Sequence, residues 1–111
     1  MLACILAASL GVDAAEIRTG ATAHVRANAI WFEDAAKLTE WQRLKQSGDA
    51  AAFSSYESNA LGAREAWQFI NELTVKILGY EPKSNQVTVE MTTPGRLVGT
   101  RWVLDARDLL P

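Results

Sequence analysis

A two-residue alternation of apolar and polar side chains, over about the last forty residues, constrains this chain more than any other feature. Apolar side chains occupy every second position from Leu73 to Ile77 and again from Val87 to Met91. Such alternation indicates β-strands with one buried face. A cluster of turn-forming residues separates the two runs, so the pattern predicts a β-hairpin over residues 73–91.

A third strand is predicted after a second turn, in which Pro94 and Gly95 take the two central positions. Residues 97–104 place apolar side chains on both faces, which is typical of a central strand. Three antiparallel strands with tight turns leave two edges and an apolar face to be covered. We therefore expect residues 67–111 to close into a small antiparallel β-barrel, or to be covered by the preceding helices.

The middle of the chain carries the signals of two helices. Asp34 is expected to cap the first and Asp49 the second, because each carboxylate can accept a free backbone N–H. Gly48 supplies the left-handed conformation that ends the first helix. The connection is short, so we expect a helical hairpin at about residues 34–61, packed on the barrel, and hence an α+β fold. A short edge strand is predicted at residues 22–27.

Residues 1–12 form an apolar run of small and aliphatic side chains, and the small pair Ala14-Ala15 follows. This is the profile of a secretory signal peptide, and the run is too short to span a bilayer. We therefore expect residues 1–15 to be a signal peptide and residues 16–111 a single domain. The protein would be periplasmic or secreted in a bacterium, without stable membrane insertion. Because no basic residue precedes the run, a buried N-terminal element of a cytoplasmic protein is the alternative.

The composition excludes several function classes. The 111 residues suit one domain, and 11 basic against 13 acidic residues give a net charge of -2. No global field attracts a phosphate backbone, so nucleic acid is not expected as a partner. Cys4 and His24 are the only residues of their kinds. We therefore expect no disulfide within the chain, no zinc or haem site built from these side chains, and no cofactor.

Catalysis finds little support in the residues. His24 lies in a predicted strand without an identifiable acidic partner, so a nucleophile would have no general base. Glu33 and Asp34 form a local carboxylate pair that helix capping explains. Asp105 and Asp108 form a second pair, which we interpret as part of a solvated turn. We therefore expect a protein that is not an enzyme; a small hydrolase built on these carboxylates is an alternative.

The C-terminal third resembles the bacterial SH3-like domains found in exported proteins. The resemblance rests on residues 73–78 (LTVKIL), 86–91 (QVTVEM) and 95–105 (GRLVGTRWVLD), the last of which is similar to the Gly-x-x-Trp-Val strand of that family. It implies a small barrel with a short 3₁₀ turn at residues 105–109. It does not imply proline-rich ligands, because the aromatic first loop that SH3 domains use for them is not recognisable here.

Four tryptophans give the best indication of a binding surface. Trp31 and Trp41 are expected in the core. The other two can line a groove, because SH3-like barrels bind ligands along a surface of aromatic side chains and Trp is seldom fully buried. The interior of the barrel, against Leu104 and Val89, is the alternative place for Trp102, and the one that we favour. The candidate ligand-binding residues are Trp67, Tyr80, Arg101 and Trp102.

Taken together, these patterns indicate a non-enzymatic exported binding module with an SH3-like barrel. Its expected ligand is a protein, a peptide or a cell-wall polymer such as peptidoglycan. The alternative is a structural or assembly protein that forms a homodimer through the helical hairpin of residues 34–61.

Overall fold

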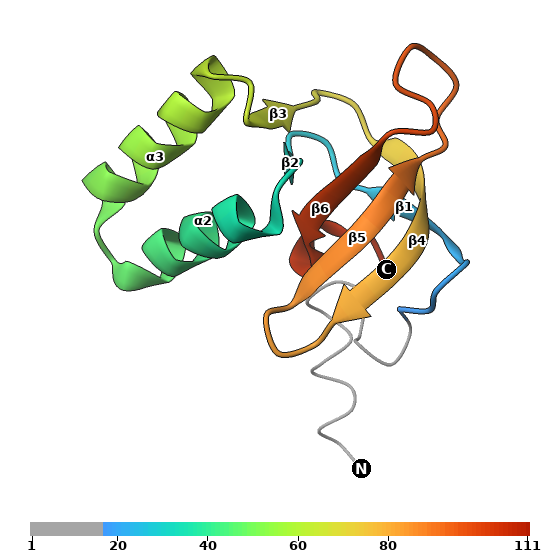
Figure 1. Ribbon diagram of the computed structural model, residues 1–111, viewed down its shortest axis with the longest axis horizontal. Coiled ribbons are helices and arrows are strands. Elements are labelled where there is room, and N and C mark those ends of the chain that lie inside the picture. Colours follow the sequence, from blue (N-terminus) through green and yellow to red (C-terminus); the bar gives the residue numbers. More distant parts are fainter. Residues whose placement is uncertain (1–16) are drawn as a thin grey trace.

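The computed structural model describes residues 17–111, so the expected signal peptide of residues 1–15 lies outside the described residues. Two α-helices and six antiparallel strands make the described chain an α+β protein, as the sequence predicts (Figure 1). The elements are β1 (Thr22–Val25), β2 (Ile30–Phe32), α2 (Ala35–Ser47), α3 (Ala50–Gly62), β3 (Ala66–Gln68), β4 (Leu73–Glu81), β5 (Gln86–Met91), β6 (Arg101–Asp105) and the 3₁₀ helix η3 (Ala106–Asp108).

The six strands form one sheet in the order β1-β4-β5-β6-β2-β3. The predicted hairpin is confirmed, since β4 and β5 pair with Ile77 opposite Val89, and a bulge lies between Ile77 and Gly79. Strand β6 pairs with β5 so that Trp102 is opposite Val89. The expected N-terminal edge strand is also present as β1. The alternation in the sequence therefore defines which face of β4, β5 and β6 is buried.

The sheet is open, so closure into a barrel is not confirmed. The chain after β6 nevertheless returns to β1. Leu109 forms an isolated antiparallel bridge with Val25, and the backbone N–H of Arg26 donates to the carbonyl of Asp108 at 2.9 Å. Arg26 Nε also donates to Asp108 Oδ1 at 2.7 Å. The C-terminal residues therefore cover the outer edge of β1 at its Val25 end, which protects that part of the edge from pairing with another chain.

Two apolar cores lie on opposite faces of β2. The first contains Trp31 and is built mainly from the inward side chains of β4, β5 and β6, including Val75, Val89 and Trp102. The second contains Phe32 and joins β2 and β3 to the two helices. Successive residues of a strand point to opposite faces, so adjacent aromatic residues serve different cores. The expected burial of Trp31 and Trp41 is confirmed.

The helix caps are those that the sequence predicts. Asp34 Oδ1 accepts from the N–H of Ala36 at 2.7 Å, and Asp49 Oδ1 accepts from the N–H of Ala52 at 3.0 Å. Gly48 has a φ of 84° and ends α2. The two helices contact each other, since Trp41 Nε1 donates to Glu57 Oε2 at 2.9 Å across the pair.

Two sequence predictions need correction. The third strand was expected to include residues 97–104, but β6 begins only at Arg101. Residues 92–100, with the apolar pair Leu97-Val98, form a loop. The pair Asp105 and Asp108 is buried, where a solvated turn was expected.

Candidate functional site

Four aromatic side chains meet where β2, β3 and β6 lie next to one another. Trp102 makes edge-to-face contacts with Trp31, Trp67 and Phe69, at ring-centroid distances of 6.0, 6.2 and 6.0 Å. Trp102 is 4% exposed, and its Nε1 donates to Thr100 Oγ1 at 2.7 Å. Trp102 therefore lies inside the fold, which is the placement that we favoured from the sequence. Trp67 and Phe69 are half-buried at the edge of the cluster.

The structure brings together only two of the four residues that the sequence predicts to bind a ligand. Trp67 and Trp102 are in contact. Arg101 is exposed and precedes Trp102 in β6, so its side chain lies on the other face of the strand. Tyr80 lies near the end of β4 at Glu81, beside the turn to β5, where its hydroxyl donates to Asn85 Oδ1 at 3.0 Å. A single groove made of all four residues is therefore not present.

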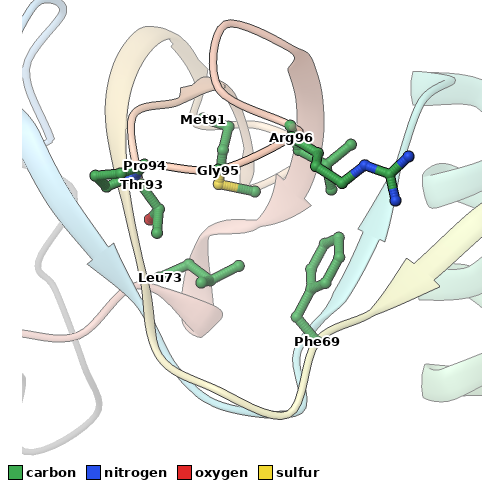
Figure 2. Close-up of a pocket in the computed structure, with 8 residues that line it drawn as sticks. Phe69, Leu73, Met91, Thr93, Pro94, Gly95 and Arg96 are labelled. Atoms are coloured by element: carbon green, nitrogen blue, oxygen red, sulfur yellow. The ribbon is translucent and has the colours of Figure 1, made fainter.

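An open pocket of about 610 Å³ lies beside the aromatic cluster, and we call it the mouth pocket. It opens between the start of β4 and the loop of residues 92–100. Figure 2 shows Phe69 and Leu73 on one side of it and Met91 and Pro94 on the other. The volume suits a small ligand or a few side chains. Its lining residues are Phe69, Leu73, Met91, Thr93, Pro94, Gly95, Arg96 and Leu97.

Exposed apolar side chains accompany this pocket. Ile70 is 77% exposed and Val98 is 56% exposed, and they are the two large hydrophobic residues that residues 17–111 leave exposed. Ile70 follows the pocket residue Phe69, and Val98 follows the pocket residue Leu97. Neither side chain lines the pocket itself, and each is related to it as the sequence neighbour of a lining residue.

Hydrogen bonds hold the loop of residues 92–100 in shape. Thr93 Oγ1 accepts from the N–H of Thr74 at 2.7 Å and donates to the Thr74 carbonyl at 3.1 Å. The N–H of Gly99 donates to the Met91 carbonyl at 2.8 Å, and Thr100 Oγ1 donates to the Leu97 carbonyl at 2.6 Å. A pocket wall that is already ordered loses little conformational entropy when a ligand binds.

A buried polar network joins α2 to the sheet. Gln42 Nε2 donates to Asp105 Oδ2 at 3.1 Å, while Gln42 Oε1 accepts from Gln86 Nε2, also at 3.1 Å. Gln86 donates as well to Thr39 Oγ1 at 2.8 Å. These hydrogen bonds connect α2 to β5 and β6, so we interpret their role as fixing the helix on the sheet.

Asp108 is a buried carboxyl group in the segment after β6 that returns to β1. Burial raises its pKa above the ordinary value, although the neighbouring Arg26 guanidinium acts in the opposite direction. Its Oδ1 accepts from Arg26, whereas Oδ2 is buried without a hydrogen-bond partner in the described part of the chain. Its ion pair with Arg26 joins the residues after β6 to the end of β1, so we interpret it as a structural group.

The histidine of the described chain contacts one carboxylate. His24 Nδ1 lies 3.5 Å from Glu72 Oε2, and both side chains are more than half exposed. Among residues 17–111, no three His, Cys, Asp or Glu side chains gather where they could hold a metal ion. The walls of the mouth pocket are mainly apolar, and Arg96 contributes their one guanidinium.

Sequence reasoning missed the mouth pocket. The available signal was the pair of apolar dipeptides, Phe69-Ile70 and Leu97-Val98, in segments that lie between strands. Connecting segments are usually polar, so large apolar residues there point to a surface that another molecule covers.

Three comparisons with known proteins gave no match: no protein-family model, no curated protein and no solved structure matches this chain. In the part of the chain that the structure describes, no helix has both the length and the apolar character needed to cross a membrane.

Proposed function

We propose that this protein is a non-enzymatic binding module that holds a segment of another protein or a peptide in the mouth pocket. One observation carries this proposal: the two large exposed hydrophobic residues of residues 17–111 each follow, in the sequence, a residue that lines the pocket. An apolar side chain of the ligand would cover this surface and remove it from water, which is favourable in proportion to the area buried.

A protein or peptide ligand is favoured over a cell-wall polymer by the character of the walls. Phe69, Leu73, Met91 and Leu97 supply apolar surface. A sugar chain would have to bury hydroxyl groups against these side chains, and burying a hydroxyl without a hydrogen-bond partner is unfavourable. An apolar amino-acid side chain has no such cost.

We also propose that the strands form an SH3-like unit with the two helices packed on it as a hairpin. The order β1-β4-β5-β6, followed by η3 and by the return of Leu109 to Val25, supports this arrangement. The two helices are then an insertion between β1 and β4, and α2 is attached through Gln42.

Export is part of the proposal and rests on the apolar run at residues 1–12. The intact mass of the protein from its native host tests it. A mature chain that begins at residue 15 or 16 supports export, and a retained Met1 contradicts it.

Selection of a random peptide library displayed on phage tests the binding function. The full chain is compared with a double variant, Ile70→Ser and Val98→Ser, whose fold should persist because both side chains are exposed. We expect peptides to be enriched on the wild type and not on the variant. Co-sedimentation with purified peptidoglycan is run in parallel. Binding of peptidoglycan without enrichment of any peptide would assign the ligand to the polymer, and failure of both would overturn the proposal.

A homodimer through the helices is a second candidate. Only Ala60 is buried in α3, and Phe53 lies half-buried beside a shallow pocket of about 170 Å³ near Gly48. Sedimentation velocity at micromolar concentration decides this point, since a strict monomer excludes the dimer.

A further inference from the structure

The loop that forms one wall of the mouth pocket is a local patch of positive charge in an acidic protein. The whole chain has a net charge of -2. Residues 92–101 contain Arg96 and Arg101 and no acidic residue. Arg96 lines the pocket, whereas Arg101 lies at the base of the loop, where it is opposite Glu90 in the neighbouring strand. The pocket therefore has one cation of its own.

The guanidinium of Arg96 is available to a ligand. Within residues 17–111 it forms no ion pair and no hydrogen bond with a carboxylate. Two nearby carboxylates contact groups other than Arg96. Glu72 lies beside His24, and Glu33 accepts a hydrogen bond from Trp67 Nε1 at 3.3 Å. A guanidinium is less strongly hydrated than an ammonium and binds a carboxylate through two parallel N–H donors.

The guanidinium of Arg96 places a positive charge beside the apolar walls of the mouth pocket. Figure 2 shows the Arg96 side chain extending away from Thr93 and Pro94, with its guanidinium at the outer rim of the pocket beyond Phe69. A side chain seated between Phe69 and Pro94 would thus have a cation at one end. In an extended peptide, adjacent residues are about 3.4 Å further along the chain, a step that a flexible arginine can span.

We propose that the ligand segment is an acidic peptide, in which an apolar side chain enters the mouth pocket and a carboxylate next to it pairs with Arg96. This inference rests on the proposed binding function and narrows its ligand class. Arg96 determines specificity: the apolar walls hold the anchor, and the guanidinium selects acidic over basic neighbours.

The experiment is a repeat of the phage selection with three full-length proteins: the wild type, Arg96→Glu and the control Lys83→Glu. Lys83 is exposed in the turn between β4 and β5, at the other end of these strands from the pocket. Both substitutions change the net charge by the same amount. We expect the wild type and Lys83→Glu to enrich apolar peptides that carry Asp or Glu, and Arg96→Glu to enrich peptides that carry Lys or Arg.

The most enriched peptide is then synthesised with a fluorescein label and titrated by polarisation. We expect Arg96→Gln to weaken binding about fivefold, the upper range for an exposed ion pair. The loss should shrink in ~1 M NaCl, where the Debye length is about 3 Å. Enrichment of apolar peptides with no acidic preference, still lost in the Ile70→Ser and Val98→Ser variant, would overturn this inference while leaving the binding function intact. No enrichment on the wild type would overturn this inference as well, and together with a failure to bind peptidoglycan it would overturn the proposed binding function.

Discussion

Replacing Gln42 by leucine should destabilise the fold by about 2 kcal/mol, because this one side chain satisfies groups on two strands. Gln42 donates to Asp105 at 3.1 Å and accepts from Gln86 at 3.1 Å. Gln42 and Gln86 are 9% exposed and Asp105 is 5% exposed. Leucine has a similar size but no polar atom, so the substitution leaves a buried carboxylate oxygen without its donor.

The magnitude follows from what remains after the substitution. A hydrogen bond to a charged group contributes about 1.5–3 kcal/mol, and a neutral one about 1 kcal/mol. Asp105 keeps the N–H of Arg107 at 2.9 Å, and Gln86 keeps Thr39 at 2.8 Å. The new buried methyl groups offset about 1 kcal/mol of the loss. The net cost is about 2 kcal/mol, which lowers the Tm by roughly 10 °C in a domain of this size.

Equilibrium unfolding in urea, followed by tryptophan fluorescence, measures the effect. The matched control is Gln46→Leu, because Gln46 lies one turn further along α2 and is exposed. A double-mutant cycle with Asp105→Asn isolates the pair, and Asp105→Asn should cost less in the Gln42→Leu background. Equal urea midpoints for Gln42→Leu and Gln46→Leu, at equal slopes, would refute the role of the network.

Three further predictions concern the cluster, the loop and the C-terminal return. Trp102→Ala should cost ~4 kcal/mol because the side chain is buried among aromatic rings, and Trp67→Ala about half of that, both measured by urea unfolding. Gly99 has a φ of 88°, so Gly99→Ala should lower stability by about 1 kcal/mol, measured as a lower Tm. Because burial raises the pKa of Asp108, the folded state binds its proton more tightly than the unfolded state does, and lowering the pH through that window favours folding. The urea midpoint of the wild type, minus that of Asp108→Asn, should therefore increase as the pH falls from about 7 to about 4. A difference between the two midpoints that does not change with pH would contradict this prediction.

Local features were predictable from the sequence because they depend on neighbouring residues. The caps at Asp34 and Asp49 need only a carboxylate and the next turn of helix. The β4–β5 hairpin follows from alternation around a turn. Both depend on contacts that are short in sequence, where propensity and periodicity carry most of the information.

Long-range features were not predictable by the same means. Asp105 and Asp108 resemble residues of a solvated turn, and only the folded chain brings Gln42 and Arg26 against them. The three residues of β2 are too few to show alternation, and their strand state is imposed by pairing with β3. The mouth pocket likewise combines two loops that are far apart in sequence.

The order of the sheet explains why a pocket forms beside the aromatic cluster. Strands β1 and β4 are neighbours, yet the chain between them contains both helices and the ribbon of β2 and β3. That segment has to leave β1, dock beside β6 and return to β4. On its return it carries Phe69 across Trp102 and next to the loop of residues 92–100. The wall at Phe69 thus depends on β2, β3 and the docked helices, whereas the wall at Pro94 depends on β5 and β6. Loosening α2 should therefore move only one wall, and a peptide that needs both would bind more weakly to the folded fraction of Gln42→Leu than to the wild type.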